Sequence, residues 1–152
     1  PALAKLLQYK FIDLDALIEK VVKKSIDNIF TDEGEVFFRD LETKCLNEII
    51  KIPSLVISTG GGVVLKKENW GMLHQGIVVW IDLERNIALE RLYKDSDRRP
   101  LLANKDIEKT YDKLFDARES LYMQADLQIK VNHETPEKVA EMILHLVNKK
   151  IT

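Results

Sequence analysis

The sequence predicts a single α/β domain in which helices cover both faces of a parallel sheet. Two runs, "SLVIST" at 54–59 and "GIVVWID" at 76–82, are rich in apolar β-branched residues, as expected of strands buried on both faces. Segments with helical periodicity separate the strand-like runs, and this alternation implies parallel strands. Ligands of such sheets bind beyond the carboxyl ends of the strands. Polar residues that follow a strand are therefore the candidates for function.

The first half of the chain alternates without a linker or a repeat. "PALAKLLQYK" has apolar residues at helical spacing, which predicts a helix over 2–8, and Pro1 is tolerated in a first turn. The apolar run that ends in "FIDLD" predicts a strand over 10–14, and "ALIEKVV" predicts a helix over 15–24. "SIDNIF" indicates a short helical turn that Gly34 can end, and a longer helix over 35–50 follows.

The second half continues the alternation. "GGGVVLKKENWGMLHQ" indicates a glycine turn and then a short helix, and Pro136 after Thr135 is a start signal for the last helix. From residue 54 we expect strands at 54–59, 76–82 and 127–131, helices at 84–93, 108–124 and 135–149, and a polar segment at 94–106.

Composition excludes several classes of protein. The 152 residues suit one domain with a real core, and their net charge of −2 argues against a basic nucleic-acid surface. The longest apolar runs, of about five residues, fall far short of the ~20 that a membrane helix needs. Cys45 is the only cysteine and cannot form an internal disulfide, which favours a reducing compartment. Its helical spacing from Phe38 and Leu41 predicts a buried thiol.

Asp13 and Asp15 stand at the end of the first strand. If both lie in extended chain they share a face, with Cα atoms about 6.6 Å apart. Two interpretations remain open. Asp15 can be the N-cap of the next helix, or the paired carboxylates can serve a metal ion and a proton transfer.

"TGGG" at 59–62 leaves the backbone bare after a buried strand, so that a ligand can approach closely. The alternative is a turn that needs positive φ, for which one glycine usually suffices.

Arg39 and Arg118 fall among apolar core positions of their helices, where an arginine needs an acidic partner or a bound anion. Glu42, three residues after Arg39, is a candidate ion-pair partner.

"DSDRRPLL" resembles a lid, because it is polar and carries two arginines before Pro100. Arginines on a mobile loop suit a reaction in which charge develops on phosphate. The alternative is a solvated surface loop. We take the approximate bounds of this lid as 94–106.

Six stretches together resemble the shikimate kinase family: "FIDLD", "SIDNIF", "GEVFFR", "STGGG", "RRPLL" and "DARESLY", in that order over nearly the whole chain. The resemblance implies a single domain over 1–152 with the three-layer P-loop kinase fold and a five-stranded parallel sheet. It also implies transfer of the γ-phosphate of ATP to the 3-hydroxyl of shikimate, on the route to aromatic amino acids. Mg²⁺ is the implied cofactor. A monomer in the cytoplasm, or in the plastid of a plant or alga, is expected, without a nucleic-acid or membrane partner.

The resemblance also implies roles for single residues. Asp15 is similar to the carboxylate that binds the substrate hydroxyl and takes its proton. Asp13 and Ser58 are similar to residues near Mg²⁺. Arg39 and Arg118 resemble the pair that holds the shikimate carboxylate. The remaining implied roles belong to Gly60, Gly61 and Gly62, which line the shikimate pocket, to the lid residue Arg99, which reaches the phosphates, and to Arg91, which stacks on adenine.

One family element is absent from the 152 residues: the phosphate-binding loop G-x-x-x-x-G-K-[ST]. In the family it follows the central first strand, and "PALAKLL" is similar to the helix after it. We therefore expect a chain that lacks this strand, whose flanking strands lie about 9.6 Å apart with unpaired edges, and that by itself binds ATP poorly and transfers no phosphate. The family's nucleotide contact near 132–136 has no clear match.

Three rival hypotheses remain. The first is a shikimate-kinase-like protein that lost phosphate binding and acts as a binding or regulatory module. The second is another small-metabolite kinase, such as one that acts on gluconate. The third is a purely structural domain in which every polar residue named above is a cap or an ion pair.

Overall fold

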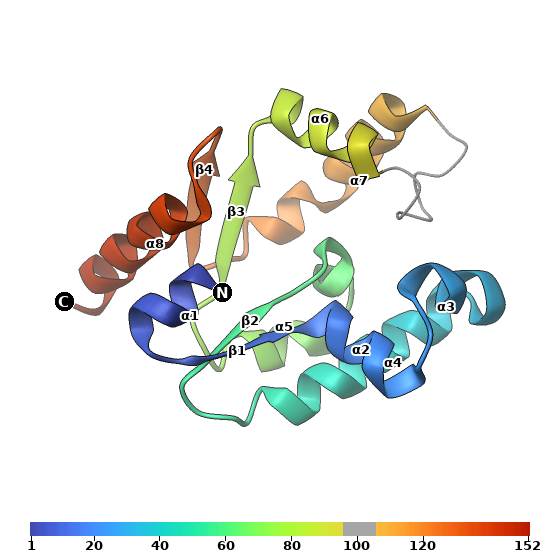
Figure 1. The fold of residues 1–152 in the computed structure, drawn as a ribbon, viewed down its shortest axis with the longest axis horizontal. Coiled ribbons are helices and arrows are strands. Elements are labelled where there is room, and N and C mark those ends of the chain that lie inside the picture. Colours follow the sequence, from blue (N-terminus) through green and yellow to red (C-terminus); the bar gives the residue numbers. More distant parts are fainter. Residues whose placement is uncertain (96–105) are drawn as a thin grey trace.

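The computed structural model describes residues 1–95 and 106–152, so Arg99 and most of the expected lid lie outside the described residues. Helices and strands alternate as predicted (Figure 1). Their order is α1 (Ala2–Leu7), β1 (Lys10–Asp13), α2 (Leu14–Val22), α3 (Ile26–Glu33), α4 (Glu35–Ile49), β2 (Leu55–Ser58), the 3₁₀ helix η1 (Gly61–Leu65), α5 (Lys67–Leu73), β3 (Val79–Leu83), α6 (Arg85–Asp95), α7 (Ile107–Tyr122), β4 (Leu127–Val131) and α8 (Pro136–Ile151).

The strands form two parallel pairs. β1 pairs with β2, with Asp13 opposite Ser58, and β3 pairs with β4, with Leu83 opposite Val131. Among the described residues, β2 and β3 share no ladder of hydrogen bonds. The predicted interruption of the sheet is therefore confirmed, and the structure shows that it separates β1 and β2 from β3 and β4.

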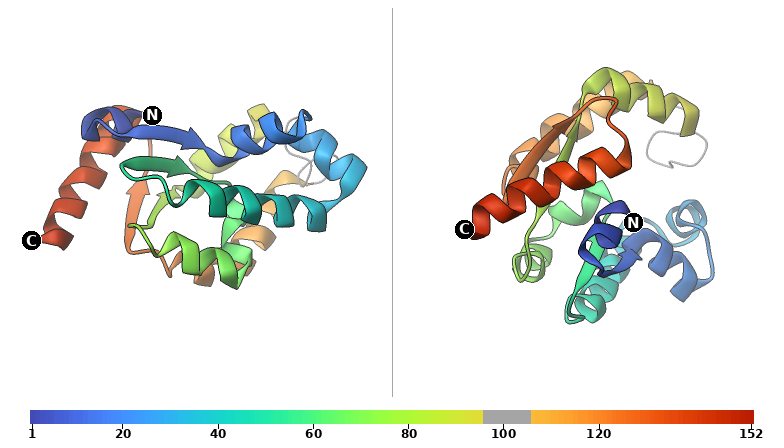
Figure 2. Two further views of the ribbon diagram at one scale, coloured as in Figure 1. Left: turned by 90° about the horizontal axis from the view of Figure 1, so that it is seen from below. Right: turned by 60° about the vertical axis from the view of Figure 1, so that its left-hand side comes forward.

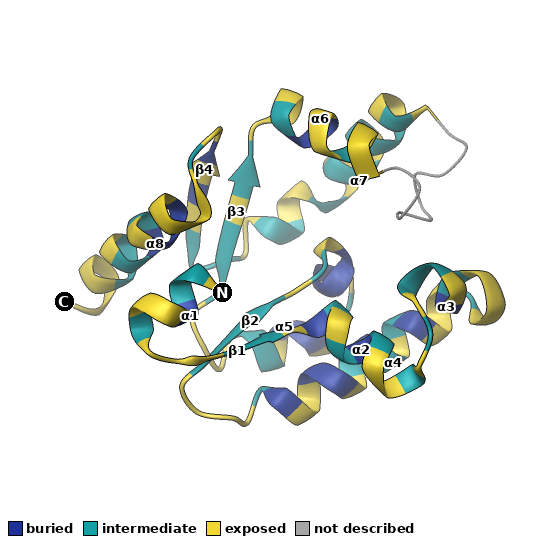
Figure 3. Cartoon of the chain, in the orientation of Figure 1, coloured by how far each residue is buried: buried dark blue, intermediate teal, exposed yellow. Residues whose placement is uncertain are grey.

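Burial of the strands is lower than the apolar runs predicted. β2 has no fully buried residue (Figure 3). Ile81 in the middle of β3 is 52% exposed. The expectation of strands buried on both faces is wrong for β2 and β3, because each belongs to a sheet of only two strands. The helices therefore cover the faces of β2 and β3 only in part.

The two strand pairs are joined by helices on one side. α1 contacts β1, β2 and α8, while α8 contacts β4, so α1 and α8 bridge the pairs (Figure 2). The apolar core is divided in the same way. One cluster gathers around α2, α4 and α5 and includes Ile29 and Leu46, and a second cluster lies between β4 and α8 and includes Ile129 and Ile143.

The start of α2 corrects the interpretation of "FIDLD". Asp13, rather than Asp15, is the N-cap: its Oδ1 accepts a hydrogen bond from the backbone N–H of Ala16 at 2.9 Å. Asp15 stands in the first turn of α2. The two carboxylates therefore do not share the face of one strand, because the chain has turned into a helix between them.

Two further expectations concern the burial of the cysteine and the presence of a membrane-spanning helix. Cys45 is buried in α4, and burial raises the pKa of its thiol. No helix in the described ranges is long and apolar enough to cross a membrane.

Candidate functional site

The carboxyl ends of β1 and β2 bring together an acid and a hydroxyl. Ser58 donates a hydrogen bond from its Oγ to Oδ2 of Asp13 at 2.9 Å, while the other carboxylate oxygen of Asp13 caps α2. The register of the parallel pair sets this contact, since the two residues are direct partners. Asp13 and Ser58 form a small oxygen-rich group at the edge of the sheet where ligands are expected.

The three glycines that follow β2 each lie against a side chain from a different helix. A Cβ built on Gly60 would lie 3.2 Å from Oδ2 of Asp15, on α2. One on Gly61 would lie 2.9 Å from the hydroxyl oxygen of Tyr122, on α7. One on Gly62 would lie 2.2 Å from Nη1 and Nη2 of Arg39, on α4.

This arrangement explains the triple glycine. Gly34 is the only glycine with positive φ among the described residues, so the turn does not need glycine for its backbone angles. The absence of a Cβ at these positions allows side chains of the protein itself to approach the backbone closely. The close approach of a ligand, which was expected from the sequence, stays a prediction. The turn thereby brings a carboxylate, a phenol and a guanidinium to one short stretch of backbone, named here the glycine turn (60–62).

Arg39 is nearly buried, and it has the acidic partner that the sequence offered. Its Nη1 donates to Oε1 of Glu42 at 3.0 Å, and its Nε lies 3.5 Å from Glu35. The guanidinium also lies over the ring of Phe38, 5.1 Å from the centroid. Nη1 makes the hydrogen bond to Glu42, whereas Nε is buried without a hydrogen-bond partner among the described residues, so donors on Nε and Nη2 are left for another acceptor.

Glu42 is fully buried, which is unusual for a carboxylate. Its Oε1 accepts from Arg39, but Oε2 is buried without a hydrogen-bond partner among the described residues. Burial raises the pKa of Glu42; the charge of Arg39 opposes that shift, and the nearby charge of Asp15 adds to it. Glu42 therefore holds Arg39 against the glycine turn and belongs to the same electrostatic cluster as Asp15.

Arg118 reaches the same turn from α7. Its Nη1 would lie 3.7 Å from a Cβ on Gly61, and its charge lowers the pKa of Glu42. Tyr122, one helical turn further on, donates a hydrogen bond from its hydroxyl to the carbonyl oxygen of Gly61 at 3.0 Å. Tyr122 was not identified from the sequence, because a tyrosine among the apolar positions of a helix does not reveal what its hydroxyl contacts.

A buried amide braces the chain after the glycine turn, and no sequence pattern pointed to it. Asn69 on α5 is fully buried; its Nδ2 donates to the carbonyl of Val63 at 2.9 Å, and its Oδ1 accepts from the hydroxyl of Thr43 on α4 at 2.9 Å. Trp70 donates from Nε1 to the carbonyl of Val64 at 3.0 Å. These bonds fix η1 against α4, the helix that carries Arg39.

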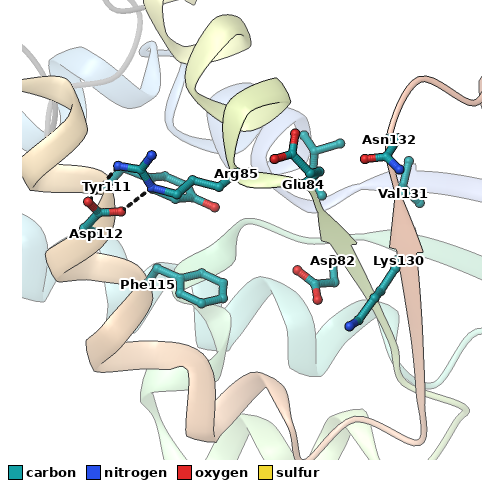
Figure 4. A pocket seen from close by; sticks show the side chains of 10 residues that line it. Asp82, Glu84, Arg85, Tyr111, Asp112, Phe115, Lys130, Val131 and Asn132 are labelled. Carbon is teal, nitrogen blue, oxygen red and sulfur yellow. Dashed lines mark hydrogen bonds and ion pairs between the residues drawn. The ribbon is translucent and has the colours of Figure 1, made fainter.

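A cavity of about 360 Å³ opens at the carboxyl ends of β3 and β4 (Figure 4). Asp82 from β3 and Lys130 from β4 point toward Phe115 of α7. Arg85 at its edge is held by Asp112, through bonds of 2.8 and 2.9 Å, and by Glu108 at 2.8 Å. The remaining lining residues are Leu83, Glu84, Tyr111, Val131 and Asn132.

The structure gives few contacts for the residues that were expected to bind the nucleotide. Arg91 is exposed on α6, and none of the hydrogen bonds or ion pairs of the described residues involves it. In the segment after β4, the N–H of Asn132 donates to Glu134, and Thr135 caps α8. Arg99 lies outside the described residues.

Within the described residues, no group of three or more His, Cys, Asp or Glu side chains could hold a metal ion. Mg²⁺ does not require such a group, because it keeps several waters and is bound through one or two carboxylates and substrate phosphates. Asp13 and Ser58 supply oxygen donors 2.9 Å apart at the sheet edge, which fits a magnesium ion held mainly through water.

The fold, with parallel strands flanked by helices and charged side chains gathered beyond the carboxyl ends of β1 and β2, is that of a phosphotransferase of the P-loop kinase class. The family model for shikimate kinase matches residues 1–148. The chain belongs to the shikimate kinase family.

Named relatives and solved structures agree with this assignment. A shikimate kinase of Prochlorococcus marinus (strain MIT 9211) is 51% identical over 140 residues, which are 92% of this chain and 71% of that protein. One from Nostoc punctiforme is 44% identical over 97% of this chain and 81% of its own length. The structure of shikimate kinase from Acinetobacter baumannii in complex with shikimate has a TM-score of 0.94 at 37% identity, over 98% of this chain and 84% of that one. Shikimate kinase from Aquifex aeolicus gives 0.84 at 33% identity, over 98% and 87%.

Proposed function

We propose that the protein acts as a shikimate kinase whose substrate site is the cluster around the glycine turn. The reaction is transfer of the γ-phosphate of ATP to the 3-hydroxyl of shikimate. The observation that carries the site assignment is that Gly60, Gly61 and Gly62 bring Asp15, Arg39 and Arg118 to one stretch of backbone. One side chain able to accept a proton and two able to bind a carboxylate are thereby assembled from three helices.

Arg39 and Arg118 are proposed to bind the carboxylate of shikimate. Charge-assisted hydrogen bonds from guanidinium groups to a carboxylate are short and strong, and they fix the orientation of a small ligand. Arg39 is pre-oriented by Glu42 and Phe38, so little side-chain freedom is lost when the ligand binds. The ion pair that appeared as a rival explanation of Arg39 is, in this proposal, what orients it for binding.

Asp15 is proposed to bind and deprotonate the reacting hydroxyl. As the hydroxyl oxygen forms its bond to the γ-phosphorus, its proton passes to the carboxylate of Asp15, and the bond between that phosphorus and the bridging oxygen of ADP breaks. The backbone of the glycine turn lies beside the carboxylate, since a Cβ on Gly60 would lie 3.2 Å from Oδ2 of Asp15. Catalysis is then mainly positioning and charge stabilisation.

Asp13 and Ser58 are the residues proposed to hold Mg²⁺, which, when bound, neutralises charge on the phosphates. Arg99 is proposed to reach the phosphates of ATP from the lid at 94–106, and Arg91 to stack on adenine. We also propose a monomer without a nucleic-acid partner, in the reducing cytoplasm or, in a plant or alga, the plastid. The net charge of −2 supports the absence of a nucleic-acid partner, and the single cysteine supports a reducing compartment.

A coupled ADP-release assay with ATP, Mg²⁺ and shikimate tests the proposal, on the protein expressed from its natural start codon. Turnover that requires shikimate is expected, with gluconate inactive in its place. Asp15→Asn should lower kcat by about 10²- to 10⁴-fold, because general-base catalysis contributes that much.

The outcomes separate the proposal from its rivals. Shikimate binding without turnover, abolished by Arg118→Ala, would identify a binding module that kept the pocket. Turnover with gluconate would identify another metabolite kinase. Full activity of Asp15→Asn would overturn the assignment of the base.

A further inference from the structure

The helix that carries Arg118 is weakly anchored by apolar packing. α7 is 16 residues long, yet none of its residues is fully buried, in contrast to α4, which contributes five (Figure 3). Apolar burial is the dominant force that fixes a helix in place. The position of α7 must therefore depend more than usual on specific contacts.

Tyr122, in the last turn of α7, makes two such contacts. Its hydroxyl donates to the carbonyl of Gly61 at 3.0 Å, and its ring packs on Trp80 of β3 with the centroids 5.6 Å apart. The ring contact fixes the direction of the phenol, and the hydrogen bond then joins α7 to the glycine turn. A rigid aromatic ring holds its hydroxyl with little loss of side-chain freedom.

Tyr122 and Arg118 are four residues apart, so they lie on the same face of α7, one turn from each other. Both reach the same backbone position: a Cβ on Gly61 would lie 2.9 Å from the Tyr122 oxygen and 3.7 Å from Nη1 of Arg118. The hydrogen bond of Tyr122 is thus made at the residue beside which the guanidinium lies.

We propose that Tyr122 is a positioning residue whose hydroxyl sets the place of Arg118 relative to the glycine turn. Loss of that bond lets the end of α7 move away from the turn, and the two arginines then no longer meet both oxygens of one carboxylate. This inference rests on the proposed role of Arg118 in binding the substrate carboxylate.

The test is Tyr122→Phe in the protein expressed from its natural start codon, since this change removes the hydroxyl and keeps the ring on Trp80. Loss of one hydrogen bond predicts an increase of about 3- to 10-fold in KM for shikimate, with KM for ATP unchanged. Tyr93→Phe is the control. Tyr93 on α6 is 58% exposed, and its hydroxyl has no hydrogen bond among the described residues, so KM for shikimate should stay unchanged.

A double-mutant cycle with Arg118→Ala distinguishes positioning from general stability. Tyr122→Phe should raise KM much less in the Arg118→Ala background than in the wild type. An equal effect in both backgrounds, or no effect of Tyr122→Phe on KM, would overturn the inference. If Arg118→Ala itself leaves KM for shikimate unchanged, the proposed carboxylate site fails, and the inference fails with it. If Arg118→Ala raises KM but Tyr122→Phe does not, only the inference fails.

Discussion

At the scale of single residues, the closest contact of the glycine turn is between Gly62 and the guanidinium of Arg39. The guanidinium lies where a side chain at position 62 would begin, since a Cβ there would meet Nη1 and Nη2 at 2.2 Å. The sequence indicated that the triple glycine leaves the backbone open to close approach, and the approach of a ligand stays a prediction. It did not reveal what approaches, because that depends on how α4 and η1 meet in space.

Gly62→Ala should therefore displace Arg39 and raise KM for shikimate about tenfold or more, while overpacking costs about 1–3 kcal/mol of the free energy of unfolding. The control is Gly71→Ala in α5, where a Cβ would meet nothing within 4 Å. That change should leave KM unaltered and stabilise by about 0.5–1 kcal/mol. Steady-state kinetics and urea unfolding measure both. Equal KM values for the two variants would contradict the contact between Gly62 and Arg39.

Glu42 predicts a particular dependence of stability on pH. Burial raises the pKa of its carboxyl above the ordinary 4.5. Between pH 4.5 and the raised folded-state pKa, the folded protein binds the proton more tightly than the unfolded chain does. The contribution of Glu42 to the free energy of unfolding therefore falls as the pH rises through that window.

Glu42→Gln should remove this contribution, because the amide does not titrate. Urea unfolding at a series of pH values from roughly pH 4 upward should show the variant losing less stability than the wild type as the pH rises. Parallel curves for the two proteins would show that Glu42 titrates alike in the folded and unfolded states, contrary to this expectation.

At the scale of elements, periodicity placed the α-helices and strands of the described residues to within a few residues, whereas the 3₁₀ helix η1 was expected only as a glycine turn. β4, for example, spans the predicted 127–131. The start of α2 was misjudged, because both aspartates of "FIDLD" are good caps and the pattern does not choose between them. The chain leaves the strand one residue earlier than predicted, at Asp13. The brace of Asn69 could not be foreseen, because it joins α4, α5 and η1 across distances that periodicity does not describe.

Asp13 combines two roles that substitutions can separate. Asp13→Ala should lose the cap of α2 and cost about 0.5–2 kcal/mol of stability, whereas Asp13→Asn keeps a good cap and should cost only a few tenths. Both variants lose the charge, so both should need more Mg²⁺ for half-maximal activity if the proposed metal role is right. Urea unfolding and a Mg²⁺ titration of turnover measure the two roles separately. Asp13→Asn with wild-type Mg²⁺ dependence would leave Asp13 with the structural role alone.

At the scale of the whole molecule, the division into two strand pairs is matched by two apolar clusters. The general α/β pattern was predictable, as was an interruption of the sheet by a missing strand. The unequal burial of the strands was not predictable. An apolar run shows that its residues are suited to burial, but it does not show that a neighbouring element covers them. Ile81 is apolar, lies mid-strand and remains 52% exposed.

We expect the two halves of the 152-residue chain to open separately. Ile29→Val in the first cluster and Ile143→Val in the second are matched changes, each costing about 0.5–1.5 kcal/mol. Native-state hydrogen exchange should show Ile29→Val lowering protection in β1 and β2, and Ile143→Val lowering it in β3 and β4. If either change lowered protection equally in both pairs, the chain would be one cooperative unit.

The single buried cysteine has a practical consequence. Because Cys45 is enclosed in α4 with its thiol pKa raised, it should react slowly with alkylating reagents. A cysteine introduced at an exposed position such as Val36, which is 78% exposed, can then be labelled while Cys45 is left in place. A fluorophore there would lie on the helix of Arg39 and could follow ligand binding from outside the site.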